Sequence, residues 1–362
     1  MPKVINIAGA GLGGLTAAVL LSEKFDVHVY EKNGNIGKPG GDDIEAVRNY
    51  GMGYDQIKFL HDNGIILKHT KPITKIVKYA PSGKSMTVHS ENGPLFHAFM
   101  RGPNKLSVES QLFEQAKERG VKFSFNTRKN YNEVDIVATG SVYRNVWVYG
   151  SYIKGVDVDP QKILFFMDND YSPHGYLYLI PYGPNEVTIA AGTDDFSCPL
   201  PRLLKSFIEK NEVISNLLKG ASVDHNIAGF AYYNVPESAE VNNVKFVGGA
   251  AGFLDASRGF GAKYALESGI FAARAILENI SYDALWKSAF EKELIDSFNR
   301  RLLHEKFSNS DYEKLLHGDE VSVSRYNKMP IPFRDSFEKL RNSMALTESR
   351  KKYSLEKLFS TT

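Results

Sequence analysis

The sequence has little cysteine, little net charge and few long apolar runs. Its single cysteine, Cys198, excludes an intramolecular disulfide and a cysteine-based zinc site. Its nine histidines include no His-x-x-x-His pair, so we expect no metal centre. Lysine and arginine (44 residues) nearly balance aspartate and glutamate (42 residues), and a formal net charge of +2 provides no general attraction for nucleic acid. These absences favour a protein of the reducing cytosol that uses neither a metal nor nucleic acid.

Apart from residues 4–21, no run reaches the roughly 18 apolar residues that a membrane span needs. Residues 4–21 read VINIAGAGLGGLTAAVLL. A signal peptide would not explain the glycines or Asn6, and a second strand-like run, DVHVYEK, follows directly. We therefore interpret this stretch as part of a folded domain.

The same stretch has the spacing of a dinucleotide-binding motif. VINIA predicts a strand, Gly9-x-Gly11-x-x-Gly14 a turn, and residues 15–24 a helix. Gly9 makes the tight turn, Gly11 lets the backbone approach a pyrophosphate, and Gly14 lets the helix pack on the strand. Glu31 ends the second strand, where a carboxylate accepts ribose hydroxyls and favours FAD or NAD over NADP. The predicted site also includes Leu12, Gly13 and Lys32, and for Lys32 a surface charge is the alternative.

A second segment predicts part of the same site. EVDIVATG, residues 133–140, is typical of a buried strand that ends in Ala138, Thr139 and Gly140. Small residues at the end of such a strand let a cofactor approach the backbone closely. An ordinary parallel core strand is the alternative interpretation.

A later run, KFVGGAAGFLDASRGFGAKYALESG, covers residues 245–269. It predicts a strand, a turn and a small-residue helix, and it resembles the C-terminal FAD motif of the para-hydroxybenzoate hydroxylase superfamily. Two further runs resemble the geranylgeranyl reductase family within that superfamily. HGYLYLIPYG, residues 174–183, is similar to its Tyr-x-Trp-x-Phe-Pro motif, and IGKPGGDDI, residues 36–44, to its flavin loop. The likeness runs in order along residues 1 to about 315.

This resemblance implies FAD as the cofactor and suggests roles for individual residues. Tyr176 and Tyr178 would lie over the flavin as catalytic candidates and, with Pro181, would contact the substrate. Arg101 would contact the cofactor's phosphate or adenosine, although a solvated arginine is equally consistent with the sequence. The other positions implied to surround FAD are Gly41, Asp42, Gly248, Gly249, Gly252, Gly259, Gly261 and Ala262.

The chain departs from the family's pattern at four places, one of which is the stretch between Lys122 and Val134, too short for the family's usual β-meander. Gly249 replaces an aspartate that meets the ribityl chain, so flavin binding would be weaker unless Asp42 or Asp255 substitutes. The flavin loop lacks its cysteine, because only glycines stand at positions 40 and 41. Tyr178 stands where the family usually has tryptophan.

The predicted fold is a mixed α/β fold, in which a Rossmann-like FAD-binding domain is interleaved with an antiparallel-sheet substrate domain and followed by C-terminal helices. The expected boundaries are residues 1–45, 100–150 and 240–280 for the FAD-binding domain, 46–99 and 151–239 for the substrate domain, and 281–362 for the helices. The tail from Lys339 to Thr362 carries six lysines or arginines and two glutamates. This excess predicts either a solvated helix face or peripheral contact with anionic lipid.

The sequence and the resemblance together predict a cytoplasmic FAD-dependent oxidoreductase. Its reaction would reduce C=C double bonds in an isoprenoid (geranylgeranyl-type) chain of a membrane lipid or lipid precursor, with ferredoxin or NAD(P)H as electron donor. One alternative is a flavin-dependent aromatic monooxygenase, which would need NAD(P)H and oxygen. The other is a degenerate, non-catalytic protein that binds a flavin or a lipid.

Overall fold

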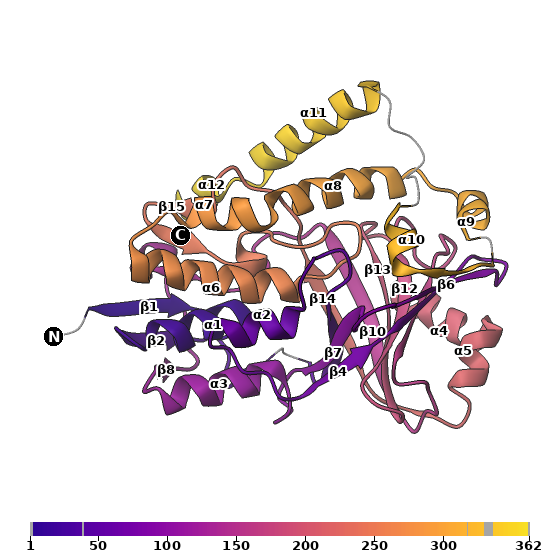
Figure 1. Ribbon diagram of the computed structural model, residues 1–362, viewed down its shortest axis with the longest axis horizontal. Helices are drawn as coiled ribbons and strands as arrows, with labels where there is room; N and C mark the ends of the chain where they lie inside the picture. The colour runs from indigo at the N-terminus through magenta and orange to yellow at the C-terminus, as the bar shows by residue number, and fades with distance from the viewer. Residues whose placement is uncertain (1–2, 38–39, 317, 329–335, 361–362) are drawn as a thin grey trace.

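The computed structural model describes residues 3–37, 40–316, 318–328 and 336–360 (Figure 1). A Rossmann-like sheet lies on the left of Figure 1 and a larger sheet on the right, with the C-terminal helices above both. Because the N-terminal strands belong to the left-hand sheet and the chain later returns to it, residues far apart in the sequence meet there.

Six strands form the Rossmann-like sheet, in the order β15-β16-β9-β1-β2-β8. Every neighbouring pair is parallel except β15 with β16. The carboxyl ends of the parallel strands therefore share one edge, which is where ligands bind in sheets of this kind. The strands are β1 (Val4–Ala8), β2 (Asp26–Tyr30), β8 (Lys122–Ser124), β9 (Ile136–Val137), β15 (Glu240–Val241) and β16 (Val244–Phe246).

Three helices pack on one face of this sheet: α1 (Leu12–Leu21), α3 (Val108–Glu118) and α6 (Ala262–Glu278). The sequence predicts α1 from about residue 15, whereas the helix begins at Leu12 and contains Gly13 and Gly14 in its first turn. The cost of glycine within a helix is offset by close packing, since a Cβ atom on Gly13 would lie 2.9 Å from the carbonyl oxygen of Ala265 in α6.

The other face of the sheet is covered partly by a short 3₁₀ turn, Tyr131–Glu133. The side chain of Val247 faces Gly13 of α1, so strand alternation directs Phe246 to the opposite face. There the rings of Phe246 and Tyr131 pack edge to face with centroids 5.6 Å apart. This aromatic contact thus covers part of the face, since the short connection between β8 and β9 adds no strand there.

The larger sheet has eight strands in the order β14-β10-β13-β12-β11-β5-β6-β17. Its β12 alternates as expected, because Leu177 and Leu179 pack toward α4 (Leu200–Lys210) while Tyr176 and Tyr178 face the other way. β12 pairs antiparallel with both β11 and β13. The strands are β5 (Lys75–Tyr79), β6 (Ser85–His89), β10 (Val146–Lys154), β11 (Lys162–Phe166), β12 (Tyr176–Pro181), β13 (Glu186–Thr193), β14 (Ser222–Ala231) and β17 (Glu320–Ser322).

A small antiparallel sheet, β3-β7-β4, connects the two large ones. β3 follows the predicted flavin loop directly, and the hydroxyl of Thr188 in β13 both accepts from the Ile44 amide (3.0 Å) and donates to Asp43 (3.1 Å). The strands are β3 (Asp43–Arg48), β4 (Thr70–Ile73) and β7 (Phe96–Arg101), and the outer helices are α2 (Gln56–Asp62) and α5 (Glu212–Leu217).

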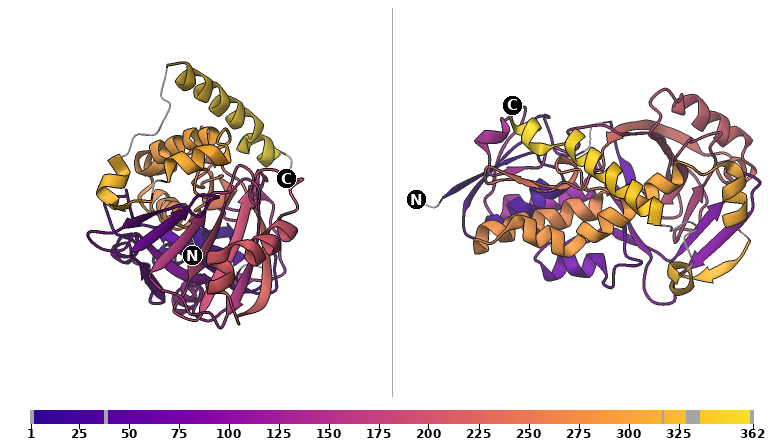
Figure 2. Two further views of the ribbon diagram at one scale, coloured as in Figure 1. Left: turned by 90° about the vertical axis from the view of Figure 1, so that its right-hand side faces the viewer. Right: turned by 90° about the horizontal axis from the view of Figure 1, so that it is seen from above.

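The sequence predicts that residues 281–362 are helical. The structure differs, because Glu320–Ser322 forms β17 at the edge of the large sheet. Val321 is buried there, which explains the strand. In Figure 2, α11 lies across α8, and in α12 Leu355 is buried in the core. The helices are α7 (Tyr282–Trp286), α8 (Lys292–His304), α9 (Asn309–Leu315), α10 (Val323–Lys328), α11 (Ser336–Lys352) and α12 (Leu355–Ser360). Within the described residues, none of the helices has the length and hydropathy that crossing a bilayer requires. The predicted mixed α/β fold is confirmed.

Candidate cofactor and substrate site

One large cavity, of about 1010 Å³, lies where the ends of β1, β9 and β16 meet the tyrosine-bearing face of the large sheet. Its volume is at the upper end of the range of about 300–1,000 Å³ that is usual for ligand and cofactor sites. Most of the predicted site residues line it together: Gly9, Gly11, Leu12, Gly13, Glu31, Lys32, Arg101, Ala138, Thr139, Gly140, Tyr176, Tyr178, Gly248, Gly249, Gly259, Gly261 and Ala262.

Five predicted site residues do not line the cavity, and each has a different role in the fold. Gly14 allows α1 to cross β1, because a side chain there would collide with the carbonyl oxygen of Gly9. Gly41, at φ +105°, lies against His225. Gly252, at φ +80°, packs against Tyr232, and Pro181 is buried at the end of β12.

The fifth is Asp42, whose carboxylate accepts hydrogen bonds from the backbone amide (2.9 Å) and side-chain amide (3.1 Å) of Asn104. Lys38 and Pro39, within the predicted flavin loop, lie outside the described residues. The carboxylate of Asp42 is therefore engaged away from the cavity.

The first turn of α1 opens on the cavity without a capping side chain. Its N-cap is Gly11, and Leu12 and Gly13 line the cavity. Gly9 has φ +103°, and a Cβ atom there would collide with the carbonyl oxygen of Ala138. Since the first backbone N–H groups of a helix lack partners within the helix, this end carries partial positive charge and suits an anion such as a pyrophosphate.

Glu31 holds this loop in place. Its two carboxylate oxygens accept hydrogen bonds from the backbone amides of Ala10 and Asn33, each at 2.9 Å. The side chain is nearly buried and lines the cavity. A carboxylate has four acceptor positions, so Glu31 retains capacity for ligand hydroxyls while it fixes the glycine loop.

The first turn of α6 opens on the same cavity. Its N-cap, Gly261, provides no side chain, and a Cβ atom there would lie 2.9 Å from Leu254. Gly259 has φ +71° and lies against the hydroxyl of Tyr176. The cavity therefore receives two uncapped helix N-termini, those of α1 and α6, from segments far apart in the sequence.

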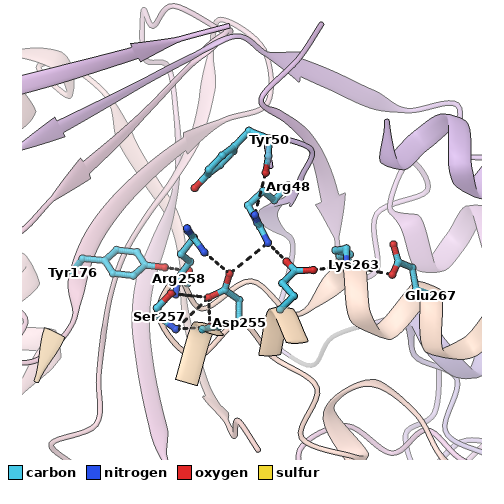
Figure 3. Close-up of polar contacts among 10 residues, drawn as sticks. Arg48, Tyr50, Tyr176, Asp255, Ser257, Arg258, Lys263 and Glu267 are labelled. Carbon is cyan, nitrogen blue, oxygen red and sulfur yellow. Dashed lines mark hydrogen bonds and ion pairs between the residues drawn. The ribbon is translucent and has the colours of Figure 1, made fainter. Parts of the chain in front are cut away.

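The loop before α6 is fixed by Asp255, which is fully buried (Figure 3). Its carboxylate accepts from Ser257, from Ser297 (2.6 Å) and from the guanidinium of Arg258 (3.1 Å). Burial would raise the pKa of Asp255, but Arg258 and Arg48, with the serine hydrogen bonds, hold that pKa well below its usual range. Asp255 thus stays charged and positions the backbone at residues 257–261.

Further charged side chains adjoin Asp255 and continue this network to Lys263 and Glu267 (Figure 3). Arg48 pairs with Glu293, which also accepts from Lys263 (3.0 Å). Lys263 in turn pairs with Glu267 (3.3 Å), and Glu267 accepts from the hydroxyl of Tyr54 (2.5 Å). The Asp255 carboxylate itself is bound by Ser257, Ser297 and Arg258 and does not line the cavity. It therefore cannot replace the aspartate that the related family has at position 249.

The two tyrosines of β12 differ in their contacts. The hydroxyl of Tyr176 donates to the carbonyl oxygen of Arg258, just before α6. Burial, with the negative charge of Asp255, raises the pKa of Tyr176. Burial, with the charge of Asp43, also raises the pKa of Tyr178 well above its ordinary value. Both side chains remain protonated at neutral pH.

Arg101 is held by two carboxylates, Glu109 (2.6 Å) and Glu45 (2.7 Å), at the wall of the cavity. Sequence reasoning identified Arg101 but not these acids, because they come from different elements and only the fold brings them together. It also missed the exposed cations Arg128 and Arg144, which line the cavity from segments without a recognisable motif.

These residues fit FAD. The Oγ1 atom of Thr139 is buried beside the cavity and has no hydrogen-bond partner in the described part of the chain. The α1 end would hold the pyrophosphate, Glu31 the ribose, and the α6 end the pyrimidine side of the flavin. A ligand with anionic character at two separated places matches two uncapped helix N-termini.

Comparison with known proteins agrees with this geometry. A family model described as an NAD(P)-binding Rossmann-like domain matches residues 7–52. Digeranylgeranylglycerophospholipid reductase 1 of Methanococcoides burtonii is 24% identical over 178 residues, which are 45% of this chain and 42% of that protein. The corresponding reductase of Methanococcus vannielii is 23% identical over 324 residues, 83% of this chain and 78% of that protein. That longer match is not typical. For the first curated relatives, the matched region covers less than half of the relative's length.

Solved structures show the same fold. A geranylgeranyl bacteriochlorophyll reductase-like protein from Thermoplasma acidophilum matches with a TM-score of 0.70 at 19% identity, covering 94% of this chain and 95% of that one. A flavin-dependent brominase matches with a TM-score of 0.59 at 15% identity, covering 84% and 87%.

The chain therefore shares the fold of this reductase-like protein and of the flavin-dependent brominase. The resemblance to the geranylgeranyl reductase-like family, expected from the sequence, is confirmed.

Proposed function

We propose that this chain binds FAD and reduces carbon–carbon double bonds in an isoprenoid chain. The observation that carries the proposal is the single cavity into which α1 and α6 both direct uncapped N-termini, beside the tyrosines of β12. In this proposal the FAD-binding part comprises residues 1–45, 100–150 and 240–280, and the substrate part comprises residues 46–99 and 151–239.

Bound FAD would supply a hydride. The chain's own residues hold the reactants and exclude water. The partial positive charge at the start of α6 would stabilise negative charge on the reduced cofactor, because helix N-termini favour anions. Asp255 keeps that loop in position, and the Tyr176 hydroxyl ties it to β12.

The large sheet provides an apolar wall for an isoprenoid substrate. Its β10, β12 and β14 contribute branched side chains to the cavity, and Phe260 adds an aromatic ring from the loop before α6: Val146, Val148, Ile180, Ile227 and Phe260. The names of the curated relatives specify digeranylgeranylglycerophospholipid as their substrate. We infer a related isoprenoid lipid, with ferredoxin or NAD(P)H as electron donor and a cytoplasmic location.

Purification and a reduction assay test this proposal. The native protein should be yellow and release FAD on denaturation, and dithionite-reduced protein should add hydrogen to a geranylgeranyl lipid, detected as a mass increase. Lys205→Ala serves as a control, because its side chain is 78% exposed and does not line the cavity. NAD(P)H-dependent oxygen consumption with a phenol would favour a monooxygenase instead. Absence of any flavin would favour a non-catalytic binding protein.

A further inference from the structure

Tyr178 presents a hydroxyl group to the cavity that no described residue of the chain satisfies. It lies on the same face of β12 as Tyr176, with ring centroids 6.0 Å apart. The Tyr176 hydroxyl is already committed to the carbonyl oxygen of Arg258. The two tyrosines lie two residues apart on the same strand, but only the Tyr178 hydroxyl is left free by the described residues to bind a ligand.

The position of Tyr178 is close to the predicted reaction centre. Its neighbour Tyr176 contacts the loop at Gly259, which leads into the N-terminus of α6. On the other side, Asp43 of β3 lies close enough for its charge to act on Tyr178, and Asp43 directly follows the flavin loop. Tyr178 is thus bracketed by the two segments that are expected to border the flavin.

A hydroxyl donor that a bound substrate covers costs free energy unless it meets an acceptor. The hydrocarbon part of an isoprenoid chain provides none. Burial and the charge of Asp43 raise the pKa of Tyr178, so its proton is retained and available for donation. An acceptor oxygen on the substrate would resolve this mismatch.

The reaction itself gives a reason for such an oxygen. When a hydride adds to an isolated C=C bond, negative charge develops on carbon with nothing to stabilise it. When the double bond is conjugated with a carbonyl group, the charge moves to the carbonyl oxygen, where a positioned hydroxyl can stabilise it.

We propose that Tyr178 recognises a carbonyl oxygen on the substrate, and that the double bond reduced is the one conjugated with that carbonyl in an isoprenoid aldehyde, ketone or quinone. This inference rests on the proposed function and narrows its substrate class.

The step balances in atoms and electrons. The β-carbon would receive a hydride, with its two electrons, which bound reduced FAD would supply and by which that FAD would be oxidised. The π electrons of the C=C bond shift to give an enolate, whose oxygen accepts a hydrogen bond from Tyr178. The α-carbon then takes a proton from the Tyr178 hydroxyl, which is replenished from water, and the carbonyl group is restored. The substrate gains one hydride and one proton.

Geranylgeranial is a suitable probe, because it carries one double bond conjugated with its aldehyde and further isolated double bonds. The wild-type holoprotein should reduce the conjugated bond in preference to the isolated ones. Tyr178→Phe should slow that reduction about a hundredfold, as expected for loss of one donor to an oxyanion. Tyr176→Phe should instead alter all reducible bonds by a similar factor, because it loosens the loop before α6.

Binding provides a second readout, independent of turnover. Geranylacetone, a ketone, should bind the oxidised holoprotein about tenfold more tightly than the hydrocarbon of equal length, and Tyr178→Phe should abolish that difference. Equal reduction of conjugated and isolated bonds, or ketone preference that survives Tyr178→Phe, would overturn the inference. If no bond of any isoprenoid is reduced but the Tyr178-dependent ketone preference persists, the proposed reductase function fails while the recognition of the oxygen stands.

Discussion

Gly13 of α1 and Gly269 of α6 meet backbone to backbone. A Cβ atom added to Gly269 would lie 2.5 Å from the carbonyl oxygen of Gly13. This contact sets the spacing of the two helices whose N-termini open on the cavity. The geometry of the predicted pyrophosphate and flavin sites therefore depends on a crossing within the core.

Gly269→Ala should push α1 and α6 apart. Overpacking of this kind typically costs about 1–3 kcal/mol, so both the melting temperature and FAD affinity should fall. Thermal unfolding and titration of the apoprotein with FAD would measure the two effects. Gly34→Ala is a matched control, since its nearest neighbour would be the side chain of Asn126 at 3.4 Å. A variant with unchanged FAD affinity would show that the helix spacing does not shape the site.

Glu31→Ala should weaken FAD binding far more than Lys32→Ala. It removes a predicted ribose acceptor and frees the Ala10 amide that the carboxylate fixes at 2.9 Å. A hydrogen bond to a charged group contributes about 1.5–3 kcal/mol, which corresponds to a loss in affinity of roughly tenfold or more. The Lys32 side chain is exposed at the rim of the cavity, so Lys32→Ala removes only a peripheral charge. Equal dissociation constants for the two variants, measured by fluorescence titration, would remove Glu31 from the site.

The sequence predicted those parts of the site that one short segment encodes. The glycine spacing at residues 9–14 and the acid at Glu31 are local patterns, and Gly9, Gly11 and Glu31 line one cavity. The site role of the α6 start, by contrast, was predicted from the resemblance to the flavoprotein superfamily. Asp42 was predicted to face the cofactor from its place in the flavin loop, but Asn104, more than 60 residues away, binds its carboxylate instead.

What the sequence could not predict depends on contacts between distant elements. Glu109 lies in the cavity wall only because α3 brings it to Arg101. Similarly, the different contacts of Tyr176 and Tyr178 depend on where the Arg258 carbonyl oxygen falls, which no pattern within β12 encodes. Local periodicity determines which face a side chain takes, whereas tertiary contacts determine whether its polar atom is free.

Gly249→Asp tests whether the missing aspartate leaves room for a carboxylate. A Cβ atom at this position would lie 3.1 Å from the backbone nitrogen of Ser141 and 3.3 Å from its hydroxyl, so Gly249→Ala alone should weaken FAD binding slightly. Because neither Asp42 nor Asp255 turns its carboxylate to the cavity, the new acid should gain a ligand hydroxyl. Gly249→Asp should therefore bind FAD about tenfold more tightly than Gly249→Ala. Equal affinities would mean that position 249 does not lie beside the ribityl chain.

Asp255→Asn should destabilise the protein strongly. The amide keeps the size of the side chain but leaves the partly exposed Arg258 without its charged partner, and Arg48 with Glu293 alone. Breaking a buried ion pair on one side typically costs about 3–5 kcal/mol. Ser297→Ala removes one hydrogen bond to the same carboxylate and should cost about 1 kcal/mol. Urea denaturation would compare the two, and a cost for Asp255→Asn no larger than that for Ser297→Ala would contradict the assigned role.

His304 should make the protein less stable in acid. Burial, together with the positive charges of Lys78 and Arg301, lowers the pKa of His304 to about 4. The unfolded chain, with a histidine pKa near 6.5, therefore binds more protons than the folded chain between about pH 6.5 and pH 4. The stabilising contribution of neutral His304 is complete above about pH 6.5 and is lost as the pH falls through this window.

The size of this effect follows from the two pKa values and amounts to roughly 3 kcal/mol. His304→Gln, which cannot titrate, should flatten the fall in unfolding free energy between pH 6.5 and pH 4, as measured by urea denaturation at a series of pH values. His61→Gln is the matched control, because the His61 side chain is 69% exposed, and it should retain the parent's pH dependence. Should His304→Gln and the parent lose stability in parallel across this window, the acid sensitivity would have to come from other groups.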